Sequence, residues 1–133
     1  MNLIGADLPF AILADANLNG ANLNAANLQG AILRCTVLQG ADLSSATVHW
    51  DQLAQARSLL GATMPDGLVY DGRLNLPGDL ALLEASQSEI QDPEVLAAFY
   101  GVPTTAYLAG QEWLSTNGPM FSLAKNRCDR PTE

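Results

Sequence analysis

The chain has few basic residues and no long apolar segment. Of its 133 residues, six are Lys or Arg and 14 are Asp or Glu, which gives a net charge of −8. Binding to a phosphate backbone requires clustered Lys and Arg, so this balance argues against a direct nucleic-acid partner. No apolar stretch is long enough to span a membrane, and no basic segment precedes an apolar one as in a signal peptide. We therefore expect a soluble, cytoplasmic protein without a membrane partner.

Cysteine and histidine are also scarce, and Cys35, Cys128 and His49 are the only examples. They form no CxxC motif and no Cys/His cluster, so no metal site is indicated. A lone histidine needs a nucleophile or metal partners to be catalytic, so we interpret His49 as a surface residue. The chain also lacks a P-loop and the GxSxG and HExxH motifs. We expect no enzymatic activity, no cofactor and two reduced, unpaired thiols.

The clearest positive signal is a strict period of five residues. A leucine, replaced once by valine, stands at every fifth position: Leu3, Leu8, Leu13, Leu18, Leu23, Leu28, Leu33, Leu38, Leu43, Val48 and Leu53. An alanine stands two residues before most of these positions, and the residue between is often Asn or Asp. A period of five matches neither an α-helix nor a β-strand, so another repeat architecture must bury the leucines.

The pattern A-(D/N)-L-x-x resembles the pentapeptide-repeat family. The best matches begin at Ala16, Ala21, Ala26 and Ala41, where the sequence reads ANLNG, ANLNA, ANLQG and ADLSS. The resemblance covers residues 1 to about 55. It implies a mainly β fold, namely a right-handed, quadrilateral β-helix with four pentads per coil and slightly under three coils. In that fold the central Leu and the Ala two positions earlier point inward.

Elementary packing arguments agree with this implication. A large Leu and a small Ala can fill a narrow interior at crystal-like density, and each buried Leu contributes about 1.5–3 kcal/mol. A single pentad buries nothing alone, so only stacked coils are stable. The four pentads per coil that the resemblance implies would place residue n above residue n+20. The ends of such a stack expose unpaired backbone groups. We therefore expect a C-terminal cap, an oligomer or a partner to cover at least one end.

The repeat loosens around Leu53. Asp51 replaces the inward alanine of its pentad, and we expect Ser58 at the next central position. The GATMPDG segment that follows resembles the terminal segment of many cyanobacterial pentapeptide proteins. It contains turn residues, which indicate that the chain leaves the coil there.

The chain is therefore predicted to divide into four segments. Residues 1–67 form the β-helix, and residues 68–78 form a linker or a final strand. Residues 79–116 form short α-helices that cap or pack on the β-helix. Residues 117–133 form a polar, flexible tail.

Helix signals are clear in the third segment. Asp79 can cap a first helix, and Asp92 can cap a second helix that ends at Gly101. Either Thr104 or Thr105 can cap a third helix. The spacing of the second and third helices also fits a DNA-binding helix-turn-helix. However, the third helix has no Lys or Arg to meet phosphates, so two simply packed helices are favoured.

Stacking residue n on residue n+20 also predicts an exposed apolar patch. Phe10, Gly30 and Trp50 would share one corner of the coil. The patch comprises five outward residues: Phe10, Ile12, Ile32, Val37 and Trp50. A contiguous apolar patch requires an explanation. Either the C-terminal helices dock on it, or it is a protein-binding hot spot with two aromatic anchors.

Three functions remain open at this point. The favoured one is a non-enzymatic protein–protein interaction or scaffold module that has a protein partner of unknown identity, and a homodimer is also allowed. The second follows from the resemblance, because some pentapeptide-repeat proteins mimic DNA and bind gyrase. Those proteins are long acidic rods, whereas the repeat half of this chain holds four acids: Asp7, Asp15, Asp42 and Asp51. DNA binding by the helical tail is the third function and is disfavoured.

Overall fold

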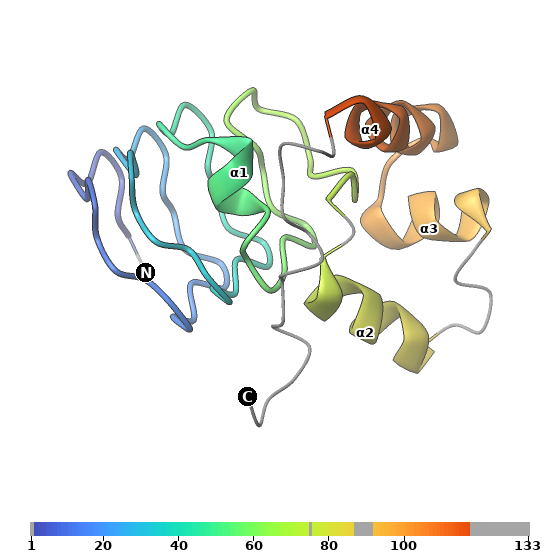
Figure 1. Cartoon of the computed structure of the whole chain (residues 1–133), viewed down its shortest axis with the longest axis horizontal. Coiled ribbons are helices and arrows are strands. Elements are labelled where there is room, and N and C mark those ends of the chain that lie inside the picture. The colour runs from blue at the N-terminus through green and yellow to red at the C-terminus, as the bar shows by residue number, and fades with distance from the viewer. Residues whose placement is uncertain (1, 75, 87–91, 118–133) are drawn as a thin grey trace.

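The computed structural model describes residues 2–74, 76–86 and 92–117 (Figure 1). The repeats form coils that stack along the long axis of the molecule, with the N-terminus at one end. The described helices are α1 (Trp50–Leu53), α2 (Pro77–Ser86), α3 (Pro93–Tyr100) and α4 (Thr104–Asn117). Helix α1 lies on the coils, whereas α2, α3 and α4 lie beyond the last coil, away from the N-terminus (Figure 1). Most of the predicted tail, from residue 118 onward, lies outside the described residues.

Isolated parallel β-bridges join the stacked coils at a constant spacing. They connect residue n to residue n+20, from the pair Asn2–Asn22 to the pair Asn27–Thr47. At these bridges a backbone N–H of one coil donates to a carbonyl of the next coil, as in Leu3 N–H to the Asn22 C=O at 2.7 Å. The predicted four pentads per coil are confirmed here. Because a turn follows almost every bridge, the described residues contain no extended strand, and a mainly β fold is not confirmed.

The turns between pentads place one residue in the left-handed region of φ. Glycine holds this position in several pentads, but other residues hold it as often. The non-glycine residues there are Phe10, Asp15, Ala25, Cys35 and Ser45, with φ from 59° to 62°. For a residue with a Cβ atom, this conformation raises the free energy by about 1–2 kcal/mol. Stacking of the coils must therefore offset backbone strain at many corners.

The core runs through the coils and consists of the repeat leucines and alanines. From Leu18 to Leu43, each central leucine is at most 5% exposed. The other central positions before α1 are half-buried: Leu3, Leu8, Leu13 and Val48. Among the described residues, the first coil has a neighbouring coil on one side only, so its leucines stay more accessible than those of the second coil.

One extra residue enters the third coil. Val37 pairs with Ser58 and Asp42 pairs with Thr63, which is one residue beyond the earlier spacing. The single helical turn α1 lies within this stretch and accommodates the extra residue. The predicted central position of Ser58 is therefore wrong. Ser58 pairs with the neighbouring coil instead, and the fully buried Leu59 takes the central position.

Gln52 replaces part of the backbone pairing that α1 interrupts. Its Nε2 donates to the C=O of Leu28 at 2.8 Å and to the C=O of Ala31 at 2.9 Å. Its Oε1 accepts from the N–H of His49 at 2.9 Å. Elsewhere in the stack, the equivalent alanine carbonyls accept a backbone N–H of the next coil. The Gln52 side chain thus gives the Ala31 carbonyl the donor that a backbone N–H supplies elsewhere in the stack. It also adds a second donor to the Leu28 carbonyl, which already accepts from the N–H of Ala31.

The last coil ends in a tight antiparallel turn. Thr63 forms a bridge with Val69, and the N–H of Met64 donates to the C=O of Leu68 at 2.7 Å. Residues 68–78, predicted as a linker or a final strand, therefore form an antiparallel β-bridge near their start, between Val69 and Thr63. We call residues 62–70 the terminal turn.

Apolar residues from the C-terminal part cover this end of the coils. Leu74 and Leu76 are at most 1% exposed, and Leu83 of α2 is also fully buried. Tyr100 of α3 lies so close to Gly72 that a Cβ there would meet the ring at 2.4 Å. The hydrophobic core is therefore continuous from the coils into the helical part.

Helices α3 and α4 pack against each other. The carboxylate of Asp92 accepts from the N–H of Glu94 at 2.9 Å, and Gly101 ends α3 with φ 71°. Both signals were predicted, and the structure confirms them. Helix α4 begins at Thr104, so Thr104 and Thr105, which were predicted as alternative caps, both lie inside its first turn. Pro103 precedes the helix instead, and its C=O accepts from the N–H of Tyr107.

Candidate functional site

Three residues of the predicted apolar patch lie together on the coils. Phe10, Ile12 and Ile32 are 73%, 77% and 48% exposed. Ile12 and Ile32 form a bridge pair, and the Phe10 ring lies over Gly30, where a Cβ would meet the ring at 2.5 Å. We call these three residues the coil face. Because they remain exposed, the expectation that the C-terminal helices dock on the patch is wrong for these three residues, although α4 does contact the patch residue Trp50 through Trp113.

The other two patch residues lie in different surroundings. Val37 is half-buried on the neighbouring pentad. Trp50 begins α1, and its ring lies 5.3 Å from the ring of Trp113 in α4, with the two planes tilted by 51°. The predicted stacking of Trp50 above Gly30 assumed an unbroken register, and the extra residue in the third coil breaks it.

Arg73 joins the two tryptophans. Its Cζ lies 4.7 Å from the Trp50 ring centroid and 4.9 Å from the Trp113 ring centroid. Asp71 accepts two hydrogen bonds from the same guanidinium, at 3.2 Å and 3.0 Å. Such cation–π contacts are worth about 0.5–1 kcal/mol at exposed sites and more when desolvated. Sequence reasoning missed Arg73 because its partners lie far apart along the chain.

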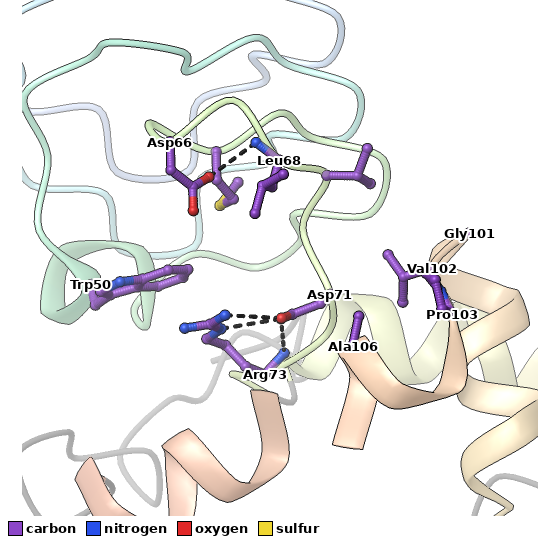
Figure 2. A pocket seen from close by; sticks show the side chains of 11 residues that line it. Trp50, Asp66, Leu68, Asp71, Arg73, Gly101, Val102, Pro103 and Ala106 are labelled. Carbon is purple, nitrogen blue, oxygen red and sulfur yellow. Dashed lines mark hydrogen bonds and ion pairs between the residues drawn. The ribbon is translucent and has the colours of Figure 1, made fainter. Parts of the chain in front are cut away.

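A cleft of about 280 Å³ opens beside this cluster (Figure 2). The terminal turn forms one apolar wall, and the connection between α3 and α4 together with the first turn of α4 forms the other. Trp50 and Arg73 lie along the cleft. The apolar wall residues are Met64, Leu68, Val69, Val102, Pro103 and Ala106. We call it the Trp50 cleft. A smaller cavity of about 140 Å³ shares three of its lining residues, Trp50, Met64 and Asp66.

The Trp50 cleft carries an excess of negative charge. Asp71 is paired with Arg73 at 3.0 Å, so these two charges offset each other. Asp66 is exposed, and its carboxylate accepts the N–H of Leu68 at 3.0 Å. Among the described residues, no Lys or Arg forms an ion pair with Asp66. Figure 2 shows this carboxylate above the Trp50 and Arg73 side chains.

A buried carboxylate ties α2 to the last coil. Asp79, predicted as a helix cap, lies inside the first turn of α2 and is fully buried. It accepts hydrogen bonds from the hydroxyl of Ser58 and from the N–H groups of Leu59 and Leu60. Burial raises the pKa of Asp79 above the usual 3.8, and the three hydrogen bonds oppose this rise only in part.

This shift has a definite consequence for stability. The folded protein holds the Asp79 proton more tightly than the unfolded chain does. The contribution of Asp79 to stability is therefore fully present below pH 3.8 and is lost as the pH rises through the raised pKa.

The remaining candidate residues show no catalytic arrangement. His49 is exposed and precedes α1 as its N-terminal cap. Cys35 is 8% exposed and is not a free thiol, so the expectation of a reduced, unpaired cysteine is wrong at this position. Cys128 lies outside the described residues. Within the described ranges, no three His, Cys, Asp or Glu side chains are grouped to hold a metal ion. No helix in the same ranges is long and apolar enough to cross a membrane.

The stacked coils, their 20-residue register and their interior of leucines and alanines define a repeat solenoid. The family model for pentapeptide repeats matches residues 1–30 and 21–56 with eight copies. This part of the chain is therefore a run of pentapeptide repeats, which confirms the resemblance read from the sequence. The family's repeat implies a β-helix fold. No curated protein matches the chain.

Proposed function

We propose that this protein is a non-enzymatic protein–protein interaction module that binds its partner through the coil face. We also infer that its coils form the right-handed, four-sided β-helix that the pentapeptide repeat implies. Phe10, Ile12 and Ile32 carry the proposal, because three large apolar side chains that stay exposed on a stacked scaffold are typical of a binding surface. The repeat family also favours an interaction role.

The size of the coil face bounds the expected affinity. The three side chains are already partly covered, so complete burial of their exposed fractions would contribute about 3–6 kcal/mol before the cost of association is subtracted. A dissociation constant of 1 μM corresponds to about 8 kcal/mol. We therefore expect a reversible complex of micromolar affinity or weaker, unless polar contacts around the coil face add to it.

Affinity capture from the native lysate tests this function. The tagged protein is compared with a Phe10→Asn/Ile12→Thr variant, in which Asn suits the left-handed φ of position 10. The matched control is Leu108→Gln, because Leu108 is 48% exposed on α4, a helix that lies beyond the last coil (Figure 1).

A stoichiometric partner that is lost in the double variant and retained by the control supports the proposal. A partner that both variants retain, or no partner at all, contradicts it. Sedimentation of the purified protein in parallel identifies the case in which the partner is a second copy of the chain.

A further inference from the structure

We propose that the Trp50 cleft is a second recognition site, which receives an apolar side chain and a neighbouring Lys or Arg from an extended segment of a protein partner. This inference rests on the proposed interaction function and names the chemistry of one contact.

The dimensions of the cleft favour a side chain over a larger ligand. Its volume of about 280 Å³ lies just below the range of about 300–1,000 Å³ that holds most small-molecule ligands. Its walls are apolar, and Leu68 and Val69 are 67% and 46% exposed. An apolar side chain would cover these two residues and the face of Trp50 that borders the cleft.

The charges beside the cleft determine which residue can lie next to the apolar side chain in the partner. Asp71 is neutralised by Arg73, whereas Asp66 accepts only the Leu68 N–H among the described residues. An incoming Lys or Arg can pair with Asp66, but an incoming acid would meet its negative charge. The net charge of −8 attracts the same cationic partner from a distance.

The backbone of the terminal turn favours an extended partner. Met64 N–H donates to the Leu68 C=O and Tyr70 N–H donates to the Ala62 C=O. These bonds flank the pair Thr63–Val69, so the N–H and C=O of Val69 point away from Thr63. Neither group has a hydrogen-bond partner among the described residues. An extended segment can pair with Val69 along this edge while its side chain enters the cleft.

Capped pentapeptides test the proposal in isolation. The probes are Lys-Thr-Xaa-Thr-Lys peptides in which Xaa is Leu, Met or Phe, because alternate residues of an extended chain share one face. The matched probes carry Glu in place of both Lys residues. Binding is followed by NMR of the full chain, using the methyl resonances of Leu68, Val69 and Ala106.

The Lys peptides are expected to shift these resonances with dissociation constants of about 1 mM, and the Glu peptides to bind about fivefold more weakly or less. Asp66→Asn should abolish this preference, and Asp15→Asn, an equal charge change on the distant coils, should keep it. Ala106→Phe should block the cleft, whereas Ala109→Phe, at an exposed position of α4, should not. The amide spectrum of each variant verifies its fold.

The proposal is overturned if no peptide shifts the cleft resonances at about 10 mM, or if the Lys preference survives in Asp66→Asn. Shifts confined to the coil face also overturn it. The Phe10→Asn/Ile12→Thr variant separates the two proposals, because it should still bind the peptides. If that variant loses its captured partner while no peptide binds the wild type, only the cleft proposal fails.

Discussion

Gln52 should be worth more to stability than a half-buried glutamine on a single helical turn would suggest. Its side chain makes three hydrogen bonds, of 2.8, 2.9 and 2.9 Å, to the backbone groups of Leu28, Ala31 and His49. Leu28 and Ala31 are 1% and 4% exposed, so their carbonyls have limited access to water. Replacing Gln52 by Ala leaves all three backbone groups without this partner.

The size of the effect follows from the hydrogen bonds. At about 0.5–1.5 kcal/mol each, three bonds amount to about 2–4 kcal/mol. Gln52 is partly exposed, so water can replace some of them, and we expect a loss of about 2 kcal/mol for Gln52→Ala. The corresponding fall in melting temperature is about 6–10 °C for a protein of this size. Urea unfolding followed by circular dichroism measures the free energy directly.

Gln52→Glu provides the sharper test. Glutamate keeps the size of the side chain and can still accept the His49 N–H, but its ionised carboxylate donates nothing to the carbonyls of Leu28 and Ala31. We expect it to be at least as destabilising as Gln52→Ala at pH 7 and to recover part of the loss near pH 4, where the carboxyl becomes a donor. Gln29→Glu, at an exposed position of the repeat, is the control. A Gln52→Glu protein as stable as the wild type at pH 7 would refute this account.

Three further predictions concern strain, charge and the tryptophan cluster. Ala25→Gly should stabilise the protein by about 1 kcal/mol and Gly20→Ala should destabilise it by the same amount, because both positions have positive φ. A Cβ at Gly20 meets nothing within 4 Å, so backbone strain alone would cause the loss. Melting temperatures equal to that of the wild type would contradict this account of strain. The free energy of unfolding of the wild type should fall as the pH rises from 3.8 through the raised pKa of Asp79. Asp79→Asn should flatten this dependence on pH, measured by urea unfolding at each pH. An unchanged pH dependence in the variant would exclude Asp79 as its source. Arg73→Gln should cost about 1–2 kcal/mol and alter tryptophan fluorescence, unlike Arg34→Gln on the exposed coil surface, because only Arg73 contacts both indole rings.

Much of the repeat part can be read from the sequence because its information is local and recurrent. Each pentad supplies the same small and large inward residues, so the position of Leu23 or Leu43 follows from the period alone. The start of α3 at Asp92 and Pro93 and its end at Gly101 are equally local signals, and the structure places them as predicted.

The errors share one physical origin. A single extra residue between Val48 and Ser58 shifts everything that follows, because pairing between coils depends on the absolute count of residues. Periodicity assigned Trp50 to a corner above Gly30, whereas the helical turn α1 directs it to Trp113. Gln52 carried no signal, because its value depends on two carbonyls of the coil beneath it.

The sequence by itself determined the five-residue repeat, the leucine and alanine interior, and the boundaries of α3, whereas the four pentads per coil came from the resemblance to the repeat family. These features depend on residues a few positions apart, or on a pattern that repeats without change. Only the tertiary structure decided that the coil face stays exposed, that Arg73 joins α1 to α4, that Asp79 is buried against the last coil, and that a cleft with an uncompensated Asp66 forms beside Trp50. Each of these depends on segments distant in sequence that meet only after the coils have stacked and the helices have packed on their end.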